Sequence, residues 1–163
     1  MWSIPLGWRG YIEVLLNLKV SSEEFFDFLI KSIVLDVNEN SKKEVSEKDI
    51  VRGFYYTKNM QNKVGKEARV KILIRELELN KKYTAVFISD HGENIISYQV
   101  EELDDGSIDV AYSEEYIAED KMSKWNFNIV NVFYKRRAKK KAIKLVKNIE
   151  AYIISNRGGE IND

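Results

Sequence analysis

The C-terminal part of the sequence constrains the fold most, because it reads as one long uninterrupted helix. From Lys124 to Ser155 no glycine or proline occurs, so about 32 residues can form a helix roughly 48 Å long. Apolar residues recur there every three or four positions, the spacing of a helix with one buried side: Val130, Tyr134, Ala138, Ala142, Leu145, Ile149, Tyr152 and Ile153. Such a helix needs a partner surface elsewhere in the chain.

That partner surface is predicted by alternating segments that precede the helix. From Tyr11 to Val20, apolar and polar residues alternate with the period of a half-buried strand. Five further segments are separated by turn residues such as Asp104-Asp105-Gly106, and tight turns between consecutive strands predict an antiparallel meander. These segments are Val51–Lys58, Glu67–Leu77, Tyr83–Ser89, Asn94–Leu103 and Ser107–Ile117.

A helix is predicted between the first strand and the meander. Ser21 can cap it, Glu24 can complete a capping box, and Val20 can pack on Phe25 as a hydrophobic staple. The apolar residues that follow lie on one side of a helix and extend to Val37. Ser46 with Asp49 repeats the capping pattern and predicts one short helical turn.

The composition fits a single globular α+β domain. The chain has 163 residues, 44% hydrophobic and 32% charged, with 26 basic and 26 acidic residues, so net charge gives no argument for a polyanionic partner. There is no cysteine, which excludes disulfides and thiolate metal sites. Neither a secretory signal nor an apolar run of transmembrane length is apparent. We therefore expect a cytoplasmic protein with no transmembrane segment, no cofactor and no metal.

The predicted order of elements is strand, helix, short helix, five-stranded meander and long helix, which is the order of the helix-grip, or START-like, fold. Five stretches together resemble a bacterial family of unknown function similar to the START-like/polyketide cyclase (SRPBCC) superfamily. They are VSSEEFFDFLIKSI (20–33), GFYYTK (53–58), VKILIRELELNKKY (70–83), ELDDGSIDVAYSEEY (102–116) and YKRRAKKKAIK (134–144).

The resemblance implies a curved antiparallel sheet of about six strands wrapped on the C-terminal helix. It also implies an apolar cavity between sheet and helix, in which members of the superfamily bind lipids or other apolar small molecules. On this basis we expect residues 1–10 to be a lead-in outside the core, residues 11–157 to form one START-like domain, and residues 158–163 to be a disordered tail.

Several side chains are candidates to line such a cavity. Tyr55, Tyr98, Tyr112 and Tyr134 fall at positions predicted to face the interior, and a tyrosine offers an apolar ring with one hydrogen-bonding tip. Ala138 and Ala142 either let the helix approach the sheet closely or leave room for a ligand. The alternative for each tyrosine is an ordinary core position with its hydroxyl satisfied at the rim.

Candidate chemistry is sparse. Glu114 shares a predicted face with Tyr112 and Tyr116; if that face is interior, desolvation would raise the pKa of the carboxyl, which could then anchor a ligand or act as an acid. The alternative is a position at the wet end of the strand. The single histidine, His91, lies in a predicted turn. No catalytic motif is present, so an enzyme would require Glu114 hydrogen-bonded to a tyrosine within a cavity.

The segment 134–148 carries eight lysines and arginines and no acid. Since these residues fill the part of the helix circumference that the apolar stripe leaves free, we interpret them as its solvated side, balanced either by solvent or by the nine acids of residues 100–120. The alternative function is an interaction protein that uses Arg136, Arg137, Lys140 and Lys141 on an acidic partner, RNA or an anionic membrane, although a nucleic-acid partner is not favoured.

Overall fold

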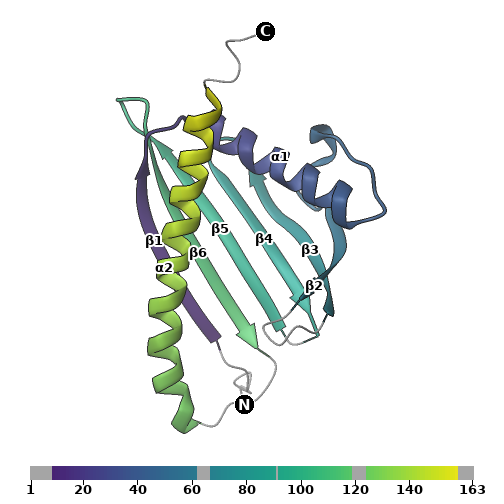
Figure 1. The fold of residues 1–163 in the computed structure, drawn as a ribbon, viewed down its shortest axis with the longest axis vertical. Helices are drawn as coiled ribbons and strands as arrows, with labels where there is room; N and C mark the ends of the chain where they lie inside the picture. The colour runs from purple at the N-terminus through teal and green to yellow at the C-terminus, as the bar shows by residue number, and fades with distance from the viewer. Residues whose placement is uncertain (1–8, 62–66, 91, 119–123, 158–163) are drawn as a thin grey trace, which may run out of the picture.

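Six strands and two long helices make up the part of the chain that the computed structural model describes, residues 9–61, 67–90, 92–118 and 124–157 (Figure 1). The side chains of residues 124–134 lie outside this description. The strands are β1 (Arg9–Leu18), β2 (Tyr55–Gln61), β3 (Glu67–Glu78), β4 (Lys82–Ser89), β5 (Gly92–Glu102) and β6 (Ile108–Ala118). The helices are α1 (Ser22–Asn40), the short 3₁₀ helix η1 (Glu47–Asp49) and α2 (Lys124–Asn156).

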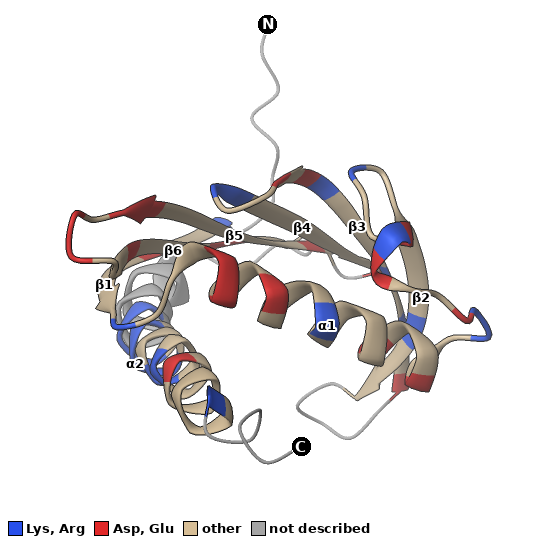
Figure 2. Ribbon diagram, turned by 90° about the horizontal axis from the view of Figure 1, so that it is seen from above, with Lys and Arg blue, Asp and Glu red and all other residues tan. Residues whose placement is uncertain are grey.

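All six strands form one antiparallel sheet in the order β1-β6-β5-β4-β3-β2. The strands β2 to β6 are the predicted meander, and β1 closes the sheet by pairing with β6 from Arg9 opposite Ile117 to Leu18 opposite Ile108. Both long helices cover the same, concave face of this curved sheet: α2 runs along β1 and β6, whereas α1 crosses one end of the strands (Figures 1 and 2). The predicted helix-grip architecture is confirmed.

The predicted start of α1 is confirmed in detail. The Ser21 side chain accepts a hydrogen bond from the Glu24 backbone (3.1 Å), and the Glu24 carboxylate accepts one from the Ser21 backbone (2.8 Å). Val20 and Phe25 are both buried in the core, as the hydrophobic staple requires. Ser46 and Asp49 likewise cap η1. Local capping chemistry therefore fixes where the chain turns from strand to helix.

The end of α2 is tied to the start of α1 through the same Glu24. Arg157 donates two hydrogen bonds of 2.7 Å to the Glu24 carboxylate. This hydrogen bonding from the guanidinium lowers the pKa of Glu24 to about 2. The two helices are therefore joined by a charged contact at one end of the concave face.

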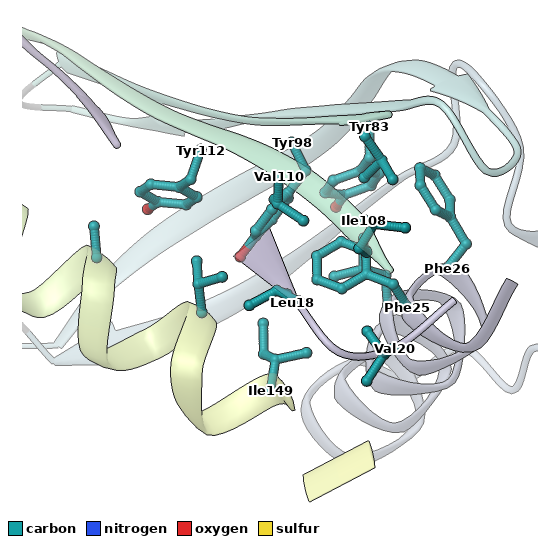
Figure 3. Packing of buried hydrophobic residues seen from close by; sticks show 14 of the residues in the cluster. Leu18, Val20, Phe25, Phe26, Tyr83, Tyr98, Ile108, Val110, Tyr112 and Ile149 are labelled. Atoms are coloured by element: carbon teal, nitrogen blue, oxygen red, sulfur yellow. The ribbon is translucent and has the colours of Figure 1, made fainter. Parts of the chain in front are cut away.

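The main core lies between the concave face and the two helices (Figure 3). Alternate residues of β1, β5 and β6 point into it, and they meet α1 and the C-terminal half of α2. Apolar burial of this kind is the principal favourable contribution to folding. Its fully or nearly fully buried members include Ile12, Leu18, Val20, Phe25, Phe26, Ile74, Ile108, Val110 and Val146.

Three details differ from the prediction. The strand expected from Val51 begins only at Tyr55, because Val51–Phe54 form a turn in which Gly53 has a positive φ of 89° and Phe54 N donates to Val51 O. On α2, Leu145 is 43% exposed and Val146 is buried in its place. Both positions satisfy a spacing of three or four residues, so spacing alone could not choose between them. Strand β1 begins at Arg9, two residues earlier than expected.

Candidate functional site

Three tyrosines lie side by side across the concave face. Tyr83 of β4 is directly opposite Tyr98 of β5, and Tyr98 is directly opposite Tyr112 of β6. The ring centroids are 6.3 Å apart for the first pair and 5.1 Å apart for the second. All three side chains are buried in the main core. The interior positions predicted for Tyr98 and Tyr112 are therefore confirmed, and Tyr83 extends the same row.

The hydroxyl groups of this row are only partly satisfied by the protein. Tyr112 donates to Glu114 Oε2 at 3.2 Å. In contrast, the hydroxyls of Tyr83 and Tyr98 make no hydrogen bond with any residue in the described part of the chain. Figure 3 shows the Tyr98 hydroxyl pointing from the sheet toward α2. Tyrosine side chains as buried as these ordinarily have a partner for the hydroxyl, so the row offers hydrogen-bonding capacity that the described residues leave unused.

Burial keeps these hydroxyls neutral. Desolvation raises the pKa of Tyr98 and of Tyr83 well above the ordinary value, with smaller contributions from neighbouring Tyr83 and Glu114 for Tyr98 and from Asp36 for Tyr83. Each hydroxyl therefore stays protonated at any physiological pH. It can donate one hydrogen bond and accept others.

Glu114 and Asn94 extend the polar part of this face toward the β6 C-terminus. Glu114 of β6 lies opposite Ile12 on one side and Ile96 on the other. Its carboxylate accepts hydrogen bonds from Tyr112 and from Asn94 Nδ2 (3.1 Å), and both Glu114 and Asn94 are half-buried. Catalysis would require a hydrogen bond between Glu114 and a tyrosine as well as an enclosing cavity, and the structure provides the hydrogen bond. An enclosing cavity, the other condition, stays a prediction.

On α2, the two alanines are on the side that faces the sheet. Ala142 is buried in the main core, and Ala138 is half-buried and packs against it. Whether they line a ligand site stays a prediction. The side chain of Tyr134 lies outside the described residues, as does His91.

The predicted interior position of Tyr55 is wrong. Tyr55 is 50% exposed on the outer face, where its ring lies between Lys43 Nζ (4.7 Å) and Lys71 Nζ (4.4 Å). Tyr56 takes the interior position and hydrogen-bonds to Asp36, which also accepts from Lys58 at 2.7 Å. Because three aromatic residues are consecutive in GFYYTK, alternation alone could not decide which of them faces inward.

Asn94 and Tyr83 were missed by the sequence analysis, although a signal for Asn94 existed. Asn94, Ile96, Tyr98 and Val100 alternate along β5, so they share one face of the sheet. The polar Asn94 in that otherwise apolar and aromatic stripe indicates that the start of β5 differs in character from the remainder of the same face.

The basic residues of α2 are exposed, as predicted for the solvated side of the helix: Lys135, Arg136, Arg137, Lys139, Lys140, Lys141, Lys144 and Lys147. Figure 2 shows them along the helix, with acidic residues at the turn between β5 and β6. Within the described residues, Lys147 pairs with Glu150 (3.8 Å) and the other seven form no ion pair. Asp105 and Glu115, from the acidic segment, pair instead with Lys19 and Arg9. Direct compensation by ion pairing is therefore not seen in this part of the molecule.

Among the residues with a described position, no group of three or more histidine or carboxylate side chains could hold a metal ion. Neither α1 nor α2, as far as they are described, contains a stretch apolar enough to cross a bilayer.

The sequence matches a known family. The family model described as "Domain of unknown function (DUF3284)" matches residues 12–135, more than half of the chain. A comparison with curated proteins gave no match. The family carries no described activity, so it transfers no functional residue to this chain.

Solved structures share the fold at low sequence identity. A protein of unknown function from Staphylococcus aureus has a TM-score of 0.69 at 15% identity, covering 94% of this chain and 98% of that one. A START superfamily protein from Mycobacterium smegmatis has a TM-score of 0.57 at 11% identity, with 89% and 97% covered. A norcoclaurine synthase from Thalictrum flavum, bound to a transition-state analogue, has 0.59 at 10%, with 93% and 98% covered. These likenesses establish the START-like fold alone.

Proposed function

The chain belongs to the DUF3284 family, and we propose that it binds an amphipathic small molecule on the concave face of its sheet, beneath α2. The observation that carries this proposal is the row of three buried tyrosines, two of whose hydroxyls have no partner among the described residues. A tyrosine whose hydroxyl has no partner gains nothing over phenylalanine as a core residue, so the hydroxyls of Tyr83 and Tyr98 are suited to bind a ligand.

The neighbouring side chains are suited to the rest of such a ligand. Ile96, Phe87 and Ala138 are half-buried and pack against the main core, so they can contact an apolar group. Binding sites for small molecules are typically apolar with a few well-placed polar groups. The fold supports the same reading, since one structural neighbour is a START superfamily protein and another was solved with a transition-state analogue bound.

A bulky substitution beneath α2 tests the proposal. Ala138→Phe should fill the space that the ligand needs and abolish the rise in melting temperature that amphipathic compounds cause in the unchanged protein. Ala151→Phe is the matched control, because Ala151 lies exposed on the same helix, and it should leave the rise intact. Equal responses in both variants, or no compound that raises the melting temperature of the unchanged protein, would count against the proposal.

A second candidate function uses the basic side of α2. Arg136, Arg137, Lys140 and Lys141 are exposed and unpaired within the described residues, and like charges four residues apart repel each other. An acidic protein, RNA or anionic membrane would relieve that repulsion. Binding should then be measurable at low salt, weaken steeply with ionic strength, and disappear when all four residues are changed to alanine. Binding that does not depend on salt would reject it.

A further inference from the structure

Glu114 places a negative charge on the concave face without a positive partner among the described residues. Its two hydrogen bonds come from Tyr112 and Asn94, neither of which is charged. None of the ion pairs formed within the described residues includes it. Its nearest neighbours across the sheet are Ile12 and Ile96. A half-buried carboxylate in such surroundings has lost solvation without gaining a counter-charge.

Asn94 adds a second acceptor to the same place. Its Nδ2 donates to Glu114 Oε1, which fixes the orientation of the amide, since the flipped amide would set its oxygen against the carboxylate. The Asn94 Oδ1 atom is then buried without any hydrogen-bond partner. Native structures rarely leave a buried acceptor unsatisfied, and the exceptions call for an explanation.

The hydrogen-bonding capacity that Glu114 and Asn94 leave unused is therefore entirely that of acceptor atoms. The carboxylate has about four lone-pair positions and uses two, and the amide oxygen uses none. A group that completes the cluster must donate hydrogen bonds. A carboxylate or phosphate group would be repelled, and a hydroxyl would bring one donor and no charge.

A protonated amine meets every requirement of the cluster. It carries three donors and the missing positive charge. The ring of Tyr112, whose hydroxyl donates to Glu114, lies 5.1 Å from the ring of Tyr98 and adds an aromatic surface of the kind that attracts cations. We propose that Glu114 and Asn94 bind the ammonium group of an amphipathic ligand whose apolar part lies along the tyrosine row. This inference rests on the proposed function and specifies the class of its ligand.

Three eight-carbon probes that differ only in their head group test it. Octylamine, octanol and octanoate are titrated into the full chain, below the concentrations at which they aggregate, and binding is measured by calorimetry. Octylamine should bind roughly ten- to a hundredfold more tightly than octanol, as expected for a charge-assisted contact, and octanoate should bind most weakly. Octanol or octanoate binding as tightly as octylamine would overturn the inference and leave the proposed function standing. No binding by any of the three would overturn both.

The variant Glu114→Gln separates the charge from the shape of the site. Glutamine is isosteric and can keep the bonds to Tyr112 and Asn94, so the fold should persist, and octylamine should then bind no better than octanol. Glu115→Gln is the matched control, because Glu115 lies on the opposite face of β6 and pairs with Arg9; it should keep the preference for the amine. An equal loss in both variants would overturn the inference. If Glu114→Gln does not fold, Asn94→Ala serves in its place: it removes one acceptor and keeps the charge, so octylamine should bind more weakly than to the unchanged protein while octanol binding changes less, and unchanged octylamine binding would overturn the inference.

Discussion

The concave face of the sheet has two ends that follow the same strands and the same alternation, yet they are buried to different degrees. At the closed end, where α1 crosses the sheet and meets the C-terminal half of α2, four inward residues are buried, while Leu16 is half-buried and Glu102 is exposed; the four are Leu18, Val100, Ile108 and Val110. At the open end, toward the N-terminus of α2, the inward residue Ile12 of β1 is buried, but four inward residues of β4, β5 and β6 are half-buried, and two of these are polar: Phe87, Asn94, Ile96 and Glu114.

The difference in burial distinguishes a part of the concave face that is suited to stability from a part that is suited to binding. The closed end has the composition and burial of an ordinary core, which α1 completes with Phe25 and Phe26. The open end keeps polar atoms that the described protein does not satisfy, notably Asn94 Oδ1. The tyrosine row lies at the boundary, with Phe25 at 5.5 Å from the ring of Tyr98. We therefore expect substitutions at the closed end to affect folding, and those at the open end to affect binding.

The largest effect should come from a truncation at the closed end. Phe25→Ala should lower the free energy of unfolding by about 3–5 kcal/mol, because Phe25 is fully buried and the cavity left behind cannot collapse completely. Ile96→Ala at the open end should cost only about 1–2 kcal/mol, since Ile96 is half-buried. Urea unfolding of both variants measures the contrast, and equal losses would remove the distinction between the two ends.

At the boundary, Tyr98→Phe should separate the two roles. Removal of a hydroxyl that has no partner among the described residues should leave the free energy of unfolding unchanged or raise it by up to about 1 kcal/mol. Ligand affinity should fall about tenfold, because the ligand loses a hydrogen bond. Tyr55→Phe, on the outer face, is the control that should change neither quantity. A large loss of stability in Tyr98→Phe would show that the hydroxyl is structural.

The contact between the helices at the closed end should make stability depend on acid pH. The pKa of Glu24 is lowered to about 2 by Arg157, so its contribution is complete above the unfolded value near 4.5 and is lost as the pH falls toward 2. The side chains are 34% and 47% exposed, and solvent screening limits the contribution to roughly 1 kcal/mol. Glu24→Gln should therefore destabilise the protein at pH 6 but hardly at pH 2.

The control for this prediction is Glu23→Gln, one residue earlier in the same turn, whose side chain is exposed and has no bond to Arg157. Unfolding by urea at the two pH values compares the variants with the unchanged protein. A loss in Glu24→Gln that is the same at both pH values would mean that the charge of Glu24 contributes nothing.

The smallest effect is expected on the basic side of α2, which faces neither end. Changing Arg136, Arg137, Lys140 and Lys141 to alanine should shift the free energy of unfolding by only about 0.5 kcal/mol, and in the stabilising direction, because three exposed like-charge pairs (136–140, 137–141 and 140–144) are relieved. The gain should shrink at high salt. A clear loss of stability would indicate that these side chains have an internal partner.

The sequence was sufficient for the order of the strands, the caps of α1 and the solvated side of α2, because each depends on local periodicity or capping chemistry. It could not predict which face of the sheet Tyr55 occupies. In a run of three aromatic residues, alternation does not show which one points inward until the turn at Gly53 sets where β2 begins. It placed Glu114 on the correct face, but its bonds depend on the register between β5 and β6, which brings Asn94 within reach. Such contacts between strands are not encoded by spacing alone.

Native mass spectrometry of the full chain, purified gently from its host, tests most directly the claim that the open end is a binding site. We predict a population whose mass exceeds that of the chain by one small molecule, and a marked loss of that population in Ala138→Phe but not in Ala151→Phe. A bound molecule retained equally by both variants, or a bare chain in every preparation, would contradict the account.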